Sequence, residues 1–258
     1  MMNFEEFKTW IKENITSKDW KETSQVEISV VKKNNGISKA GLFIRENGQD
    51  VSPILYLDDY YIHYQNGEIL ENIIRNIRAD YDEKVQMAAV KIPNLQEFEN
   101  VRGEIIYRLV NYEKNKELLE DCPHRRLHDL AVTFRWVAHI DNDGVSTSLI
   151  TNRQVKEWGV TISDLILTAQ QNTPRLFPAK IVDIEEMLAG MRSFISCLSA
   201  IPMYILTNEQ EVNGASALLY GDVLKDFANK KGTDMYILPS SIHEVILLPA
   251  DRIDDPTK

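Results

Sequence analysis

The sequence has very few cysteines and no cluster of basic residues. Cys122 and Cys197 are the only cysteines in 258 residues, which is too few for a disulfide framework and is typical of a reducing cytoplasm. There are 29 Lys and Arg against 39 Asp and Glu, which gives a net charge of −10. Because a nucleic-acid surface needs clustered Lys and Arg, we expect no nucleic-acid partner.

The sequence also lacks a long apolar run. The longest nearly uncharged stretch covers residues 193–206, and Pro202 interrupts it. It falls short of the roughly 20 residues that a helix needs to cross a bilayer. The first residues, MMNFEEFKTWIKEN, contain no apolar segment typical of a signal peptide. We therefore expect a soluble cytoplasmic protein with no membrane partner.

The short motifs of common catalytic sites are missing as well. We find no glycine-rich phosphate loop, no paired-histidine helix of zinc proteases and no Gly-x-Ser-x-Gly elbow. We therefore expect no cofactor and assign no catalytic residue. These absences favour a binding protein over an enzyme.

The residues that are present predict an α+β fold, with antiparallel hairpins packed against amphipathic helices. Hydrophobic residues make up 43% of the chain, which is enough for a folded core. Turn residues separate three pairs of apolar runs, which predicts three hairpins. They lie at residues 26–47, 129–152 and 234–249, and short strands are predicted at 52–57, 203–208 and 215–220.

Helices are predicted where apolar residues recur every three to four positions. These segments begin at Phe4, Ile69, Phe98, Thr161, Asp183 and Asp222. The segment from Phe98 is predicted to reach toward Leu119. The segment from Thr161 is predicted to end at Asn172, since Pro174 disfavours helix in the residue before it.

Pro93 marks a predicted boundary between two parts of the chain. We expect an amino-terminal α+β lobe over residues 1–92 and a larger α+β lobe over residues 93–258. The two lobes are expected to be tightly associated.

Four stretches of the chain carry a resemblance to a known family. They are SPILYLDDYYIHYQNG, LVNYEKNKELLEDCPHRRLHDLAV, AQQNTPRLFP and residues 203–249. Together they span most of the chain, and they resemble a domain-of-unknown-function family that is frequent in gut Firmicutes. The resemblance implies a bacterial cytoplasmic protein. It brings no catalytic residue, because the family has no known activity.

The stretch LPSSIHEVILLP places two serines, a histidine and a glutamate between apolar runs near the end of the chain. In an extended strand Ser241 and His243 share one face, as a nucleophile and its base would. A nucleophilic serine normally sits on a strained turn beside an oxyanion hole, and no glycine accompanies Ser241. We therefore favour a bend between two strands, with Ser241, His243 and Glu244 as candidate binding residues.

The stretch CPHRRLHDL combines residue types that can bind zinc. Cys122, His124 and His128 are suitable ligands, but their spacing is not that of a standard structural site and no second cysteine pair completes it. If this stretch is a loop that leads into a strand at Leu130, the two histidines need not converge. We expect no metal here.

Four further residues are candidate binding residues. Asn172 is expected at the end of a helix, where its amide either faces a cleft or caps the helix. Asn208 is expected in a connection that either binds a ligand or forms an ordinary turn. Tyr60 and Tyr61 belong to an aromatic cluster that suits an interface, or a half-buried link between a strand and a helix.

The function that follows is a hypothesis. We expect a non-enzymatic binding or accessory protein of a bacterial cytoplasm, with an unknown protein or small molecule as its partner. The alternative is a hydrolase or small-ligand enzyme that uses Ser241 and His243. An enzyme needs these residues in a concave pocket with an acid in reach, whereas a binding module needs an exposed apolar patch.

Overall fold

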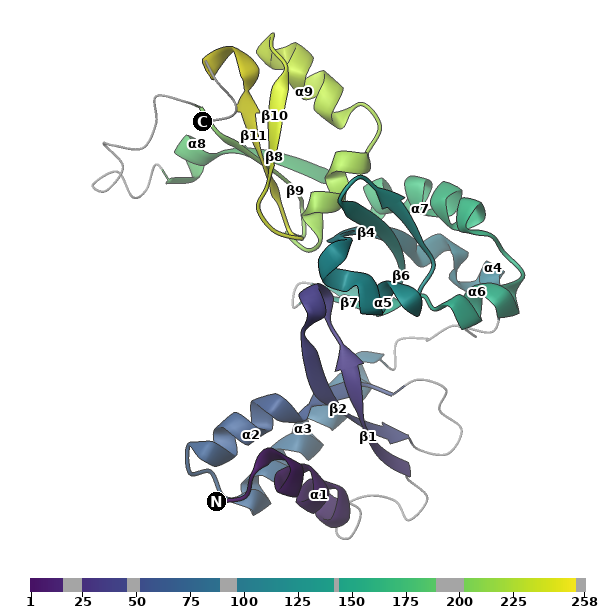
Figure 1. The fold of residues 1–258 in the computed structure, drawn as a ribbon, viewed down its shortest axis with the longest axis vertical. Coiled ribbons are helices and arrows are strands. Elements are labelled where there is room, and N and C mark those ends of the chain that lie inside the picture. Colours follow the sequence, from purple (N-terminus) through teal and green to yellow (C-terminus); the bar gives the residue numbers. More distant parts are fainter. Residues whose placement is uncertain (16–24, 46–51, 89–96, 142–143, 189–201, 254–258) are drawn as a thin grey trace. The chain divides into compact units, whose positions relative to one another are not determined.

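A computed structural model describes residues 1–15, 25–45, 52–88, 97–141, 144–188 and 202–253 (Figure 1). The chain divides into two units, residues Met1–Pro93 and Asn94–Lys258. Each unit combines helices with antiparallel sheets, which confirms the predicted α+β class. None of the helices in the described residues is both long enough and apolar enough to span a membrane.

The first unit contains a three-stranded antiparallel sheet in the order β1-β2-β3. Its strands are β1 (Gln25–Lys32), β2 (Ser38–Arg45) and β3 (Ile54–Tyr56). The predicted hairpin is confirmed, and its turn contains Asn35 and Gly36 with φ of 61° and 71°. Asparagine and glycine tolerate positive φ, so this local sequence fixes the turn.

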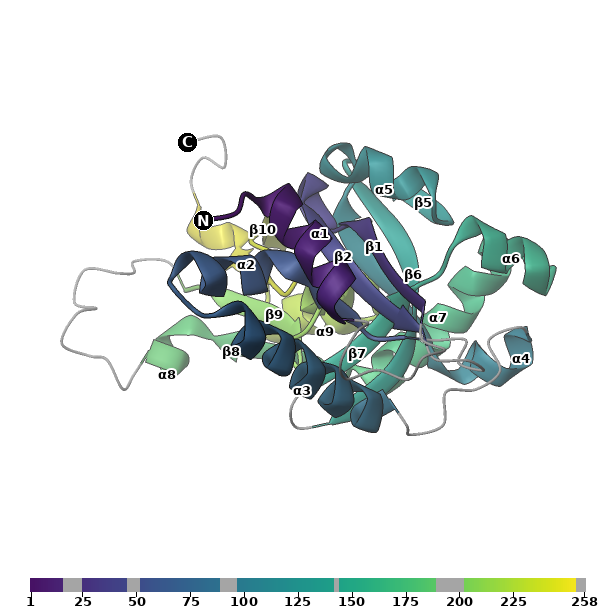
Figure 2. The same ribbon diagram turned by 90° about the horizontal axis from the view of Figure 1, so that it is seen from below.

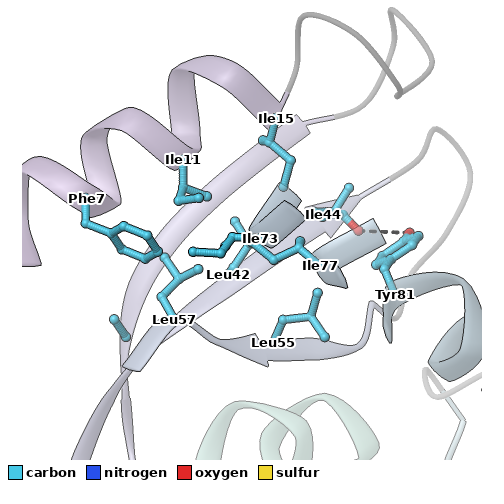
Figure 3. Packing of buried hydrophobic residues seen from close by; sticks show 11 residues of the cluster. Phe7, Ile11, Ile15, Leu42, Ile44, Leu55, Leu57, Ile73, Ile77 and Tyr81 are labelled. Atoms are coloured by element: carbon cyan, nitrogen blue, oxygen red, sulfur yellow. Dashed lines mark hydrogen bonds between the residues drawn. The ribbon is translucent and has the colours of Figure 1, made fainter. Parts of the chain in front are cut away.

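Helices of the first unit pack their apolar residues against β2. They are α1 (Phe4–Ile15), α2 (Leu57–Gln65) and α3 (Leu70–Ala88). Residues from all three helices and from β2 and β3 form one buried cluster around Leu42 and Ile44 (Figure 3). Helices were expected at α1 and α3, and both expectations are confirmed. The helix α2 is a correction, because the sequence suggested only a link there; Asp58 and Asp59 in its first turn favour a helix amino terminus.

The second unit begins with a sheet of four strands. These are β4 (Ile105–Asn111), β5 (His124–Leu127), β6 (Leu130–Asp141) and β7 (Gly144–Leu149). The order is β4-β6-β5, and β7 also pairs with β6. This confirms the predicted hairpin of β6 and β7. Figure 2 gives a second view of β5, β6 and β7.

The long helix predicted from Phe98 toward Leu119 is wrong. The structure has only the short helices α4 (Phe98–Val101) and α5 (Lys116–Glu120), with β4 between them. Five of the seven residues from Ile105 to Asn111 are apolar or aromatic, the exceptions being Arg108 and Asn111, and the strand is buried on both faces. A strand buried on both faces has no alternating pattern, so its apolar residues also matched helical spacing.

The segment before Leu130 is not the loop that the sequence left open as one possibility. It forms strand β5 rather than a loop, and β5 pairs with the start of β6. His128 lies in the tight turn between the two strands with φ of 53°. A turn of this kind usually contains glycine or asparagine, so His128 was no strong signal for a turn.

Two helices follow β7, and both begin with a capping box. In α6 (Asn152–Trp158) the pair is Thr151 and Gln154, and in α7 (Ile162–Leu176), the helix predicted from Thr161, it is Thr161 and Asp164. The predicted end of α7 at Asn172 is wrong, because the helix continues past Pro174. The last turn is held by bonds to distant segments that the sequence does not reveal, including Arg175 Nη2 to the Gly103 carbonyl at 2.7 Å and the Tyr220 hydroxyl to the Phe177 carbonyl at 2.8 Å.

A second four-stranded antiparallel sheet completes the unit, in the order β10-β11-β9-β8. Its strands are β8 (Ala179–Asp183), β9 (Tyr204–Asn208), β10 (Met235–Pro239) and β11 (Val245–Pro249). The predicted pairing of β10 with β11 is confirmed. The sequence did not predict β8, which precedes the short helix α8 (Ile184–Leu188).

Two segments connect β9 to β10. The predicted strand at residues 215–220 is wrong, because Gly214–Leu219 forms the 3-10 helix η5, in which the small residues Gly214 to Ala217 are buried. The predicted helix after Asp222 is confirmed as α9 (Val223–Lys231), and Gly232 ends it with φ of 73°. Phe227 of α9 packs edge-on against Tyr204 of β9, with ring centroids 5.0 Å apart.

Candidate functional site

Two connections of the second unit meet at one corner of the β10-β11-β9-β8 sheet. They are the β9–η5 connection, residues 209–213, and the β10–β11 bend, residues 240–244; together we call them the corner. The Asn213 N–H donates to His243 Nδ1 at 3.2 Å, and the Ala215 N–H donates to the Ile242 carbonyl at 3.3 Å. From β9 itself, the Thr207 hydroxyl donates to the His243 carbonyl at 2.7 Å. These bonds fasten segments about 30 residues apart in sequence.

Gly214 lets the two connections approach each other this closely. A Cβ on this residue would lie 2.2 Å from Thr207 Oγ1 and 2.4 Å from the His243 carbonyl oxygen. Asn213 precedes it in the left-handed region with φ of 55°. The Asn213-Gly214 pair therefore does more than turn the chain. Because Gly214 has no side chain, the β10–β11 bend can pack directly against it.

The structure brings Ser241, His243 and Glu244 together, but not as a catalytic relay. Ser241 Oγ accepts the backbone N–H of His243 at 2.9 Å. Glu244 accepts the hydroxyl of Ser240 at 3.0 Å, and His243 Nδ1 is occupied by the Asn213 N–H. In a Ser–His–acid relay, Nδ1–H donates to the acid and Nε2 accepts from the serine. The observed bonds place the neutral ring's proton on Nε2, which is the opposite tautomer.

Asn208 lies beside these residues and closes the β9–η5 connection. Its side chain is buried, and it donates to the Val212 carbonyl at 2.8 Å and accepts the Val212 N–H at 3.2 Å. The connection is further held by an ion pair of 2.8 Å between Glu211 and Lys180 of β8. The hydrogen bond from Lys180 holds the pKa of the Glu211 carboxyl below its ordinary value.

Asn172 lies away from the corner, inside α7 rather than at its end. Its side chain is 9% exposed, and Nδ2 donates to the carbonyls of Ile105 and Arg102 at 3.0 and 2.7 Å. The same edge of β4 receives two hydroxyls: Thr173 Oγ1 accepts the Tyr107 N–H and Ser216 Oγ accepts the Leu109 N–H, both at 3.2 Å. These side chains satisfy the backbone groups of an edge strand, which would otherwise stay unpaired.

Asn172→Ala should therefore lower the free energy of unfolding of the second unit by about 2 kcal/mol, because it leaves two backbone carbonyls unpaired, one of them buried. Urea unfolding combined with hydrogen exchange of β4 measures this loss. Gln171→Ala is the matched control, since Gln171 is the exposed neighbour on the same helix. An equal effect of both substitutions would contradict a structural role for Asn172.

Tyr60 and Tyr61 lie on α2 in the first unit, and both hydroxyls have internal partners. Tyr60 donates to Asp80 of α3, and Tyr61 donates to the Met2 carbonyl at 3.1 Å. Burial raises the pKa of the Tyr60 phenol above its ordinary value, and the hydrogen bond to Asp80 adds to this effect. The ring of Tyr61 lies 5.3 Å from that of Phe7. An interface role for the two tyrosines stays a prediction.

Cys122, His124 and His128 do not converge on a common point. The Cys122 thiol is buried, and this burial raises its pKa to about 11, with Asp121 adding to the effect. A metal ligand must be a thiolate, so this environment disfavours binding. His124 Nδ1 lies 3.1 Å from the Cys122 carbonyl, and His128 is exposed in its turn. In the described part of the chain, no group of three or more His, Cys, Asp or Glu is arranged to hold a metal ion.

Sequence reasoning missed three residues that build these contacts, Thr207, Gly214 and Ser216. Asn213-Gly214 gave a visible signal, but it predicted only a turn. The small residues Gly214, Ala215 and Ser216 follow Thr207 within ten positions. Such a run of small residues is the sequence feature that could have indicated a close approach between backbone segments. The sequence predicted the bend at 240–244, but nothing in it indicated that this bend meets residues 213–215.

Comparison with known proteins places the chain in a family but brings no activity. No curated protein and no solved structure matches it. A family model matches residues 4–258, which is nearly the whole chain and includes both units. The resemblance found in the sequence is thereby confirmed at the level of a family of unknown function. The chain belongs to this family, DUF5688.

Proposed function

We propose that this protein is a non-enzymatic binding or accessory protein of a bacterial cytoplasm. The observation that carries the proposal is the corner itself. Ser241, His243 and Glu244 are the best candidates for chemistry in the sequence, but His243 Nδ1 accepts the Asn213 N–H, a bond that a catalytic relay would have to break. The polar groups of the corner instead hold the β9–η5 connection against the β10–β11 bend.

Two exposed apolar side chains beside the bend, on opposite faces of one strand, support a binding role. Ile237 and Leu238 of β10 are 41% and 45% exposed, and β10 is an end strand of its sheet. Exposed apolar side chains on an end strand are a common contact surface for protein partners. The net charge of −10 supports a partner other than nucleic acid.

A fluorophosphonate probe should leave Ser241 unlabelled in the full chain, because its Oγ accepts the His243 N–H and no base among the described residues accepts its hydroxyl proton. Intact-mass spectrometry measures the labelling, and Ser240→Ala is the matched control for the neighbouring hydroxyl. Labelling of the wild type that both Ser241→Ala and His243→Ala abolish would overturn the proposal in favour of a hydrolase.

Thermal melts of the same variants give a second readout. Ser241→Ala and His243→Ala should each lower the stability of the second unit by about 1 kcal/mol, because each removes one acceptor of a backbone N–H. Residues placed for chemistry behave differently, since their loss leaves stability nearly unchanged while activity disappears.

A further inference from the structure

One face of the β4-β6-β5 sheet carries an unusual number of basic side chains. The strand registers align Arg108 of β4 with Thr133 of β6, and Thr133 with His124 of β5. Side chains of paired residues point to the same face, and alternate residues along each strand join them. We call this surface the Arg108 face; its strand positions are Ile106, Arg108, Val110, Ala131, Thr133, Arg135, His124 and Arg126. Half of these eight side chains are basic, and none is acidic.

Arg108 differs from its basic neighbours because it has no counter-ion. Its side chain is only partly exposed, and its Nε is buried without a hydrogen-bond partner. Throughout the described ranges, no carboxylate forms an ion pair with it. Burial lowers the pKa of the Arg108 guanidinium from its ordinary value, although an arginine in a protein stays charged.

The other basic residues of this face are held by contacts of their own. Arg135 donates from Nε to Thr147 Oγ1 at 2.7 Å. Arg126 donates from Nε to the His128 carbonyl at 2.9 Å and stacks on the Tyr112 ring at 4.2 Å. The Cys122 carbonyl can only accept, so His124 Nδ1 carries a proton. Arg108 is thus the basic side chain of this face that has no hydrogen-bond partner among the described residues, and its Nε is buried.

An unpaired guanidinium beside apolar residues is costly. Ile106 and Val110, two positions away on the same strand face, are each 2% exposed. Charged groups in such surroundings are normally paired with an opposite charge, and a bound anion is one explanation for an unsatisfied buried polar atom. The planar fork of arginine matches the two oxygens of a carboxylate or a phosphate.

We propose that the Arg108 face binds the oxyanion group of a small ligand, a carboxylate or a phosphate, through the guanidinium of Arg108. The buried neighbours of Arg108 restrict access to a compact group rather than a long polyanion. The assignment is independent of the corner, so it holds whether or not Ser241 has a catalytic role.

The test observes the Arg108 side chain directly. In a nitrogen–proton spectrum of the full chain, Arg108→Lys identifies the Nε–H signal of Arg108 by its loss. Inorganic phosphate and acetate are then titrated in separate samples, with chloride keeping the ionic strength constant. We expect a saturable shift of this signal with at least one anion, and the anion that produces it identifies the ligand class.

Substitutions of two arginines distinguish specific binding at Arg108 from a general attraction of anions to basic residues. Arg108→Gln should weaken binding of the effective anion by about 10- to 100-fold, the loss expected for a charge-assisted bond. Arg125→Gln is the matched control, because Arg125 is exposed on β5 and points to the opposite face. It should bind like the wild type.

Stability without ligand provides a second criterion. If Arg108 is kept for binding, Arg108→Met should melt at the same temperature as the wild type or higher, because it removes an unpaired charge. A clear fall in melting temperature would indicate a structural arginine and would overturn the proposal. So would the absence of a saturable shift with either anion, or equal binding by Arg108→Gln and the wild type. The titration of the wild type decides the question even if a variant fails to fold.

Discussion

Gly214→Ala should destabilise the second unit by about 3 kcal/mol or more, which is at the upper end for an overpacked site. The added Cβ would lie 2.2 Å from Thr207 Oγ1, 2.4 Å from the His243 carbonyl oxygen and 2.8 Å from Thr207 Cα. Two of these three atoms belong to the backbone, so no side-chain rotation relieves the clash. The β9–η5 connection and the β10–β11 bend would have to separate.

Hydrogen exchange of β9, η5 and β11 in the full chain measures the effect on the corner, and urea unfolding measures the total loss. Gly221→Ala is the matched control, because a Cβ there meets no atom within 4 Å. It should change stability by no more than about 0.5 kcal/mol. If Gly214→Ala exchanged and unfolded like Gly221→Ala, the close approach at the corner would not exist.

Phe7→Ala should lower the free energy of unfolding of the first unit by about 3–5 kcal/mol. The Phe7 side chain is 0% exposed and lies in the cluster that joins α1 to β2 and α3 (Figure 3). Its ring centroid is 5.3 Å from that of Tyr61 and 5.6 Å from that of Tyr64. Its loss would leave a cavity between helices and remove both ring contacts.

Urea unfolding with hydrogen exchange resolved by peptide distinguishes the first unit from the second. Lys12→Ala serves as the control, since Lys12 is exposed on the same helix and should change stability by less than about 0.5 kcal/mol. A loss below about 1 kcal/mol for Phe7→Ala would mean that α1 does not pack as described.

Local signals explain which parts of the fold could be predicted. Asn35-Gly36 fixes one hairpin turn, and the Thr161–Asp164 capping box fixes the start of α7. Each signal lies within a few residues and acts on its own backbone. The errors occurred where distant contacts decide. β4 is buried on both faces and lacks alternation, and the last turn of α7, beyond Pro174, is bonded to the distant residues Gly103 and Tyr220.

The candidate site was only partly predictable for the same reason. The sequence drew attention to Ser241, His243, Glu244 and Asn208, and the structure places all four around one corner. It could not show that Asn213 and Gly214 meet His243, because residues 30 positions apart carry no joint pattern. Arg108 was also invisible, since only the fold reveals that a single arginine in an apolar strand has no carboxylate partner among the described residues.

The most direct test of whether the corner is structural or catalytic is to determine which ring nitrogen of His243 carries the proton. Long-range nitrogen–proton NMR of the imidazole, under alkaline conditions where such rings are neutral, shows which ring nitrogen carries the proton. Our account predicts the proton on Nε2, with Nδ1 accepting the Asn213 N–H, as expected for a structural corner. A proton on Nδ1, with Nε2 accepting the Ser241 hydroxyl, is the arrangement of a catalytic relay and would contradict the account.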